Sequence, residues 1–224
     1  MIVSIHQPNY LPWMGFFDKI IKSDLFVILD DVDYSKNCFI NRNKIKTPNG
    51  DMWLSLPILY KSSTNINEIL LDNKQAWKRT HKNSIINCYS KSKFFKKYWT
   101  EIESYYDKDY DKMVDITVPM IKLFTKILDI NTEMVLSSTL DVNTRGSDRI
   151  LDICKKVNAA TYISGANGKD YLKKENFVLN NINITFQEYS HPMYNQRFDN
   201  FVPYMSIIDL LFNEGENSKN IILS

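Results

Sequence analysis

Three histidines are the side chains in this sequence best suited to moving protons near neutral pH. They are His6, His81 and His191, and an unperturbed imidazole has a pKa near ~6.5. Each could act as a general base or acid, or could hydrogen-bond a phosphate or a sugar hydroxyl. The alternative is structural, because a histidine at a strand end can simply bond a backbone carbonyl.

His6 opens a stiff segment, HQPNYLP at residues 6–12, that connecting loops rarely resemble. Loops that only connect elements are usually rich in Gly, Ser, Asp and Lys. This segment and the residue after it instead offer amides and aromatic rings: Gln7, Asn9, Tyr10 and Trp13. If a helix begins after Pro12, its first N–H groups could also receive an anion. We interpret the segment as one wall of a polar-ligand site; the alternative is a tight turn that satisfies its own polar groups.

Acidic residues follow the next apolar run, in the stretch DDVDYS. Asp30, Asp31 and Asp33 are hard oxygen donors at a strand end, which is a setting suited to Mg²⁺. The spacing fits no EF-hand loop. Alternatives are a turn cap, or pairing with Arg42 or Lys44, and we assign no metal site.

Basic and amide side chains lie on a predicted hairpin, in NRNK. Arg42 could grip a phosphate or a carboxylate with its planar fork, and Asn41 and Lys44 would accompany it. The competing interpretation is an exposed strand edge that carries basic residues for solubility.

Two further groups resemble the opening segment in chemistry. Trp77 and His81 are four residues apart on a predicted helix, so they share a face that could line a pocket, although Trp77 could equally be core. Near the end of the chain, His191 is followed by Tyr194 and Gln196. We expect the two histidine loops to face each other, and Trp13 and Trp77 to stack on a ligand ring.

The elements that must position these residues are alternating strands and helices at both ends of the chain. Apolar runs predict strands at 2–5, 25–29, 133–136, 161–164 and 182–189. Periodic spacing predicts helices at 14–22, 147–157 and 205–212, with Ser147 as N-cap. The segment 168–179 is expected to be partly helical, and the NEGENSKN tail mobile.

The middle of the chain changes character. The turn signal Thr47-Pro48-Asn49-Gly50 predicts a hairpin of 38–46 with 52–59, and 67–71 adds a strand. Helices follow at 75–89, 94–106 and 112–128, the last kinked or split at Pro119.

The predicted fold class is therefore α/β, with a mostly parallel sheet, helices, and an inserted β-hairpin and helical segment. The sheet core would come from residues 1–35 and 131–213 of one domain spanning 1–224, with the insertion at 36–130. Ligands of such sheets bind at the carboxyl ends of the strands. Four polar loops would gather there: 6–9, 30–31, 164–168 with Gly165, and 189–196.

Composition excludes several classes of protein. A net charge of +2 does not favour a nucleic-acid partner. Three widely spaced cysteines exclude a zinc ribbon and argue against a disulfide framework. No signal peptide and no membrane span is predicted, so a cytoplasmic protein is expected. The P-loop, GxGxxG, GxSxG and HExxH motifs are absent.

The segments IHQPNYLPWMGFFDKI and FVILDDVDYSKNCFINRNKIK resemble the start of the WbqC-like proteins. The resemblance continues in order through WKRTH, YISGANGKDYL, FQEYSHPMYNQ and SIIDLLFNEG. It implies that the His6 loop, Asp30-Asp31, Asn41-Arg42, His81 and Tyr194–Gln196 belong to the family's motif.

The family is encoded among genes for bacterial surface polysaccharides, notably O-antigens. The resemblance therefore implies a transferase that acylates or aminoacylates a nucleotide-linked amino sugar. The expected partners are a small-molecule substrate and an activated acyl donor, with no other cofactor indicated. A histidine would remove the proton from the attacking group, while Arg42 and the helix start would hold the phosphates.

Two alternatives stay open. The protein could be a non-catalytic sugar-nucleotide-binding or scaffold protein, with an interface formed by aromatic residues: Phe94, Phe95, Tyr98, Trp99, Tyr105 and Tyr106. It could instead be a nucleotidyltransferase-like enzyme that depends on Mg²⁺ and Asp30.

Overall fold

A computed structural model describes all residues, 1–224. The chain forms two compact units. The first contains residues 1–7, 18–31 and 130–190, and the second contains 8–17, 32–129 and 191–224. Each unit is described by itself.

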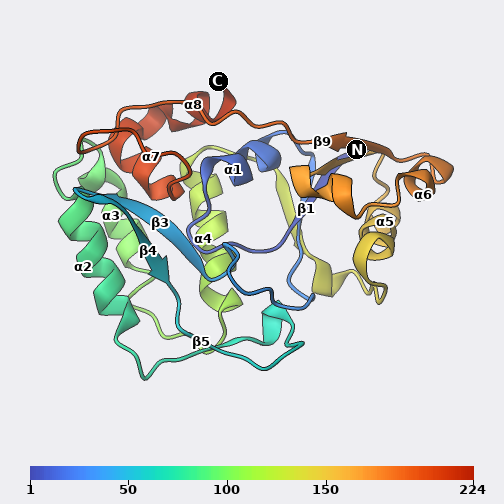
Figure 1. The fold of residues 1–224 in the computed structure, drawn as a ribbon, viewed down its shortest axis with the longest axis horizontal. Coiled ribbons are helices and arrows are strands. Elements are labelled where there is room, and N and C mark those ends of the chain that lie inside the picture. Colours follow the sequence, from blue (N-terminus) through green and yellow to red (C-terminus); the bar gives the residue numbers. More distant parts are fainter. The chain divides into compact units, whose positions relative to one another are not determined.

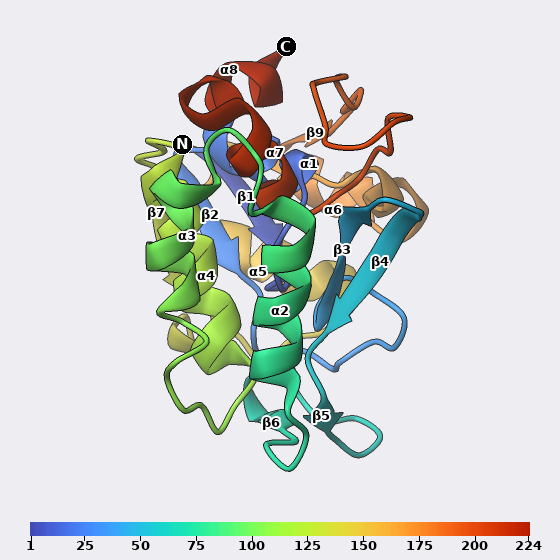
Figure 2. The same cartoon turned by 90° about the vertical axis from the view of Figure 1, so that its left-hand side faces the viewer.

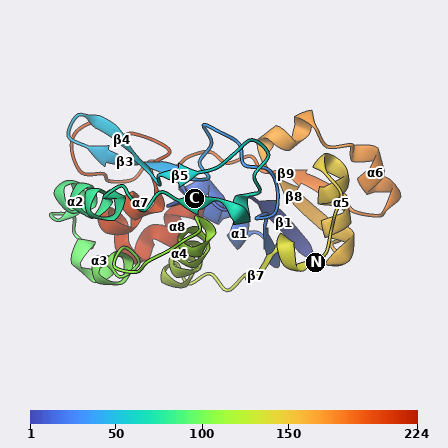
Figure 3. The same cartoon turned by 90° about the horizontal axis from the view of Figure 1, so that it is seen from below.

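The first unit is built on a five-stranded sheet in the order β7-β2-β1-β8-β9 (Figure 3). All four neighbouring pairs are parallel. The strands are β1 (Ile2–His6), β2 (Leu25–Ile28), β7 (Glu133–Leu136), β8 (Thr161–Ser164) and β9 (Asn183–Phe186). The α/β prediction with a mostly parallel sheet is confirmed, and strand β9 is shorter than predicted.

The strands of this sheet carry buried apolar side chains, which pack against a helix. Val3 and Val27 have no exposed surface, and both belong to one cluster with Ile153 and Cys154 of α5 (Gly146–Lys156). Figure 1 shows α5 beside the sheet. In the chain, η3 (Ala166–Asp170) and α6 (Lys174–Leu179) follow β8. A strand buried on both faces needs a continuous apolar run, as in IVSI and LFVI.

The second unit carries the predicted hairpin. Strands β3 (Arg42–Thr47) and β4 (Gly50–Ser55) are antiparallel and pair Thr47 with Gly50 across the turn. Gly50 has a φ of +115°, which glycine adopts without strain. The predicted strand at 67–71 is mostly wrong, because η1 (Ile66–Glu68) precedes a two-residue β6 (Leu70–Leu71) that pairs with β5 (Ile58–Leu59).

Helices form the rest of the second unit (Figure 2). They are α2 (Trp77–Tyr89), α3 (Phe95–Glu103), α4 (Val114–Ile127), α7 (Ile207–Glu214) and α8 (Ser218–Leu223). Pro119 lies inside α4, which continues past it. The tail predicted to be mobile instead forms η4 (Gly215–Asn217) and α8. None of the helices combines the length and the apolar character that crossing a membrane requires.

The aromatic helical segment is core rather than an exposed interface. Phe95, Tyr98 and Trp99 are all less than 10% exposed. The rings of Phe95 and Trp99 lie 5.0 and 6.5 Å from the ring of Phe212 on α7. The interface predicted for the scaffold alternative therefore has most of its aromatic surface buried within its own unit.

One predicted helix cap is wrong. Helix α5 begins at Gly146, and the N-cap residue is Arg145, which makes no side-chain cap. Ser147 lies in the first turn, and its Oγ accepts a hydrogen bond from the backbone N–H of Lys173 at 2.9 Å. The serine therefore joins two segments of the first unit instead of closing its own helix.

Candidate functional site

Strand order in the first unit reverses at β1, since β2 and β7 lie on one side of it and β8 and β9 on the other. In parallel sheets such a reversal opens a crevice at the carboxyl ends of the two central strands. His6 ends β1 and Gln7 follows it, while Ser164 ends β8 and Gly165 follows it. The fold therefore brings two of the predicted polar loops to the place where ligands of such sheets bind.

His6 is oriented by its own backbone neighbour. Its Nδ1 lies 2.8 Å from the carbonyl oxygen of Gln7, which can only accept, so Nδ1 carries the proton and Nε2 is the basic nitrogen. Burial, and then the charge of Lys19, lower the pKa of His6 to about 3. At neutral pH the ring is uncharged, so it is suited to hydrogen bonding rather than to holding a proton.

Lys19 is the group in this crevice that the sequence analysis missed. It lies on α1 (Met14–Ile21), is 2% exposed and forms no ion pair. A methyl group in place of the Gly165 hydrogen would lie 3.7 Å from Lys19 Nζ, so the amine lies beside the loop after β8. Burial lowers the pKa of Lys19 to about 8. A lysine inside the apolar helical run MGFFDKII was the available signal.

The neighbouring acid, Asp18, is already paired. It is 1% exposed, binds Lys22 Nζ at 2.7 Å and accepts a 2.7 Å hydrogen bond from Gln187 Nε2. Burial and the charge of Asp18 raise the pKa of Tyr189, which follows in the same segment. Asp18 thus anchors the segment after β9 to α1. Its carboxylate pairs with Lys22 and not with Lys19.

The glycine-containing loop after β8 is fixed by close packing. A methyl group on Gly168 would lie 1.9 Å from Ser164 Oγ, so no side chain fits there while Ser164 keeps its position. The Ser164 hydroxyl donates to the Gly165 carbonyl at 3.1 Å. The predicted residue Gly165 is therefore part of a rigid loop beside Lys19.

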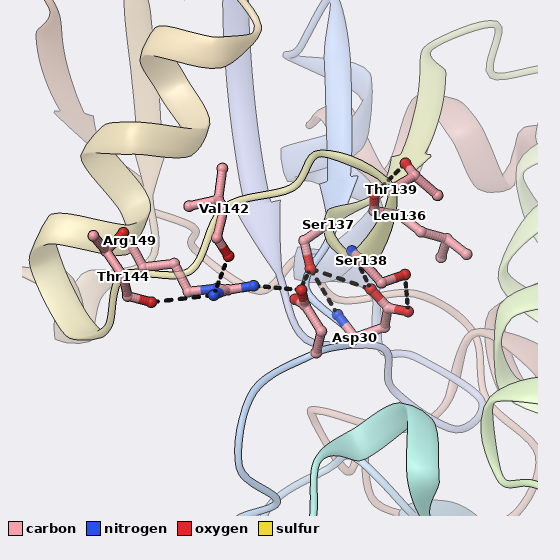
Figure 4. A network of polar contacts seen from close by, with 9 residues as sticks. Asp30, Leu136, Ser137, Ser138, Thr139, Val142, Thr144 and Arg149 are labelled. Atoms are coloured by element: carbon pink, nitrogen blue, oxygen red, sulfur yellow. Dashed lines mark hydrogen bonds and ion pairs between the residues drawn. The ribbon is translucent and has the colours of Figure 1, made fainter.

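Asp30 and Asp31, at the end of β2, are held by a polar network (Figure 4). The Ser138 backbone N–H and hydroxyl donate to the two oxygens of Asp30 at 3.0 and 2.8 Å. Arg149 forms an ion pair with Asp31 and donates from Nη1 to the Val142 carbonyl at 2.7 Å. The two acids therefore tie β2 to the segment after β7 and to α5, and no group of three or more potential metal ligands occurs.

The other predicted residues lie in the second unit, where His81 belongs to a buried aromatic cluster. Its Nδ1 is 2.9 Å from the Tyr10 hydroxyl, which is 2.6 Å from the Tyr106 hydroxyl. Trp77 packs edge-on, with ring centroids 5.6 Å apart. Burial lowers the pKa of His81 to about 4. This imidazole is an uncharged hydrogen-bonding group inside the unit.

The second half of HQPNYLP is tied down through its backbone. Tyr10 N–H donates to the Ile40 carbonyl at 2.9 Å, and Asn43 Nδ2 donates to the Leu11 carbonyl at 2.5 Å. Leu11 has a φ of +48°, which is costly for a leucine. Asn9, also predicted as a ligand contact, is 4% exposed. Hydrogen bonds and burial therefore hold this half of the segment in place.

His191 has both ring nitrogens bonded to backbone. Nδ1 donates to the Pro192 carbonyl at 2.9 Å, and Nε2 accepts from the Tyr204 N–H at 3.0 Å. The ring stacks with Trp13 at a centroid distance of 6.4 Å. Burial lowers the pKa of His191. These contacts tie the segment that carries His191 to the backbone at Tyr204.

Tyr194 and Gln196 converge on a buried acid that the sequence analysis did not single out. Asp209 on α7 has no exposed surface and accepts from Tyr194 at 2.6 Å and from Gln196 at 2.9 Å. Tyr89 donates to its other oxygen at 2.7 Å. The segment FQEYSHPMYNQ therefore ends in a hydrogen-bond network around one carboxylate.

On the hairpin, Lys44 pairs with Asp51 at 2.9 Å, and Asn41 accepts a hydrogen bond from Tyr34. Arg42 stacks on Trp53 and forms no ion pair. All three cysteine thiols are free, and Cys38 is the exposed one.

Comparison with known proteins gives a family. The model of the WbqC-like protein family matches residues 7–221. The uncharacterized protein Rv1507c of Mycobacterium tuberculosis is 29% identical over 224 residues, which cover 98% of this chain and 96% of that protein. No solved structure matches. The family model spans nearly the whole chain, and the chain belongs to the WbqC-like protein family.

Proposed function

We propose that the protein is a transferase that moves an acyl or aminoacyl group onto the amino group of a nucleotide-linked sugar, in the synthesis of bacterial surface polysaccharide such as O-antigen. One observation carries the proposal. A buried amine without an ion-pair partner, Lys19, lies beside Gly165 and raises the potential at His6, where the strand order reverses.

Lys19 is the base in the proposed reaction. The sugar amine attacks the carbonyl carbon of an activated acyl donor, so a C–N bond forms and the bond to the leaving group breaks. The neutral form of Lys19 takes the proton from the attacking nitrogen and passes it to the departing group. A general base works best when its pKa is near the operating pH, and a pKa of about 8 meets that condition.

His6 is the orienting group in the proposed reaction. Because Nδ1 donates to the Gln7 carbonyl, Nε2 accepts a hydrogen bond from the attacking amine and aims its lone pair at the donor. With a pKa of about 3 the ring keeps its accepting form at every working pH. This revises the role assigned to His6 from the sequence, where it was the base itself.

The experiment uses purified protein with an amino sugar linked to uridine diphosphate and a panel of acyl thioesters, with product mass read by mass spectrometry. Lys19→Met should lower kcat by roughly 100-fold or more, which is the usual contribution of a general base. Lys156→Met, which removes an exposed lysine of α5, should leave the rate unchanged.

The pH profile distinguishes the base from a structural lysine. The wild-type kcat/KM should rise with pH and level off above about 8, where Lys19 loses its proton. His6→Gln keeps an acceptor and should retain more activity than His6→Ala. If Lys19→Met keeps both the rate and the pH profile of the wild type, Lys19 is not the base and the proposal fails.

A further inference from the structure

One face of the hairpin in the second unit combines a planar cation with aromatic rings. In the β3–β4 register Lys44 lies opposite Trp53, and Arg42 lies opposite Ser55, two positions along. Alternation along each strand therefore puts Arg42, Lys44 and Trp53 on the same face. Figure 2 shows this hairpin beside α2.

The cations of this face differ in how they are satisfied. Lys46 donates to the carbonyls of Phe198 and Asn200, at 3.2 and 2.5 Å. Lys44 pairs with Asp51 at 2.9 Å. Arg42 has no carboxylate partner, and its Nε is buried without any hydrogen-bond partner.

The guanidinium of Arg42 is nevertheless held in place. Its central carbon lies 4.4 Å from the centroid of the Trp53 ring. Lys44 Nζ lies 5.1 Å from the same ring. Stacking on an indole fixes the plane of a guanidinium and does not use its in-plane N–H donors, which stay available for hydrogen bonds. A cation that is positioned but not neutralised is what an anion site requires.

Asn41, the residue before Arg42, makes its hydrogen bonds to other groups and does not accept from the guanidinium. The Tyr34 hydroxyl donates to Asn41 Oδ1 at 2.9 Å, and Asn41 Nδ2 donates to the Leu56 carbonyl at 3.0 Å. Asn41 is thereby a brace between two segments. Its amide oxygen is occupied by the Tyr34 hydroxyl.

Aromatic surface is exposed next to the guanidinium. Trp53 is 39% exposed and Phe39 is 36% exposed, with ring centroids 5.7 Å apart. Exposed rings of this size are usually covered when a partner binds. Flat rings of this kind accept a nucleobase by stacking.

We propose that this surface, formed by Phe39, Arg42 and Trp53, is a binding site for a nucleoside diphosphate. The guanidinium edge of Arg42 takes a phosphate through two N–H donors, and the base lies against the exposed rings of Trp53 and Phe39. The choice of a nucleotide over other ringed anions rests on the proposed function, whereas the anion site itself rests on the geometry of the hairpin.

Binding is tested with the full chain by calorimetry, using uridine diphosphate, uridine and pyrophosphate as separate probes. Arg42→Gln should weaken uridine diphosphate and pyrophosphate by roughly 10- to 100-fold, the value of charge-assisted hydrogen bonds. Trp53→Leu should weaken uridine diphosphate but not pyrophosphate. Arg79→Gln removes an exposed cation of α2 and should change neither.

Two results would overturn the inference. One is that Arg42→Gln, melting at the wild-type temperature, binds uridine diphosphate with the same affinity as the wild type. The other is no binding of uridine diphosphate at millimolar concentration. Both results are read from binding alone, so they reject this site and keep the proposed function, whereas unchanged acyl transfer in Lys19→Met rejects the proposed function alone.

Discussion

The hydroxyl of Tyr194 donates a 2.6 Å hydrogen bond to Oδ2 of Asp209, a residue with no exposed surface. Burial raises the pKa of Asp209, and the donors Tyr194, Tyr89 and Gln196 oppose that rise. The carboxylate therefore depends on these donors whenever it is charged. The segment that carries Tyr194 is in turn fixed to α7 through the same oxygen.

Tyr194→Phe should lower the free energy of unfolding by about 1–3 kcal/mol, because a buried acceptor loses a donor. The raised pKa of Asp209 means that its contribution to stability is present at low pH and is lost as pH rises through the folded pKa. Above that pKa the carboxylate is charged and depends most on its donors. The free energy of unfolding that Tyr194→Phe loses should therefore grow with pH. Urea denaturation between pH 4 and pH 8 measures it. Tyr171→Phe, at a half-exposed ring, is the control, and a deficit independent of pH would contradict the argument.

Lys19→Met should make the protein more stable at pH 7. The folded pKa, about 8, is below the ordinary value of 10.5. Below pH 8 the buried amine is charged, and this charge destabilises the folded state. A shift of this size corresponds to roughly 3 kcal/mol. The unfolded state binds more protons between pH 8 and 10.5, so wild-type stability should rise with pH there. The advantage of Lys19→Met should shrink over the same window.

Thermal melts from pH 7 to 10.5 test this prediction. Lys156→Met serves as the control, because its side chain is exposed and its replacement should not change the pH dependence. A Lys19→Met variant that is less stable than the wild type at pH 7 would mean that the amine is satisfied within the fold. Gained stability together with lost turnover would be the expected signature of a functional buried lysine.

His81 should make the fold sensitive to acid. Its folded pKa of about 4 is below the unfolded value of 6.5, so stability is fully present above pH 6.5 and is lost as pH falls toward 4. His81→Gln, which cannot be protonated, should reduce that loss. Denaturation curves at pH 7 and pH 4.5 compare the two proteins. His191→Gln is the contrasting variant, since His191 is half-buried and should contribute less. The prediction is wrong if the wild type and His81→Gln lose the same free energy of unfolding between pH 7 and pH 4.5.

Arg149→Met should be strongly destabilising. Arg149 and Asp31 have side chains only 8% and 20% exposed, and removing one partner of a buried ion pair typically costs about 3–5 kcal/mol. The double variant with Asp31→Asn should recover part of that loss, which a double-mutant cycle measures. Lys173→Met breaks the exposed pair with Asp148 and should cost less than about 1 kcal/mol. Equal costs for the two pairs would show that burial is not the cause.

Much of the fold follows from local sequence. The apolar runs at Ile2 and Leu25 predict the buried parallel strands, and Pro48-Asn49-Gly50 predicts the hairpin turn. These signals work because each depends on residues close together in the chain. Ser147 failed as a cap because a helix terminus competes with tertiary contacts, here with Lys173.

The candidate site was predictable only in part. His6 ends β1 and Gly165 follows β8, so topology alone brings them to the same edge of the sheet. Lys19 could not be identified by periodicity, because a lysine in an amphipathic helix is normally on the exposed face. The partners of His81 and Asp209 come from distant segments, as in the contact of Tyr89 with Asp209, and no local pattern encodes such pairs.

The position of β1 in the middle of the sheet has a consequence for biosynthesis. Val3 pairs with Tyr162 on one side and with Leu25 on the other. The ribosome therefore releases the central strand β1 long before its neighbour β8. During that interval an apolar strand edge is unpaired, which is a setting for aggregation and for chaperone capture. Because pairing over such a long chain separation is intrinsically slow, we expect closure of the sheet to be the slow step of refolding, whereas the hairpin can form early from neighbouring residues.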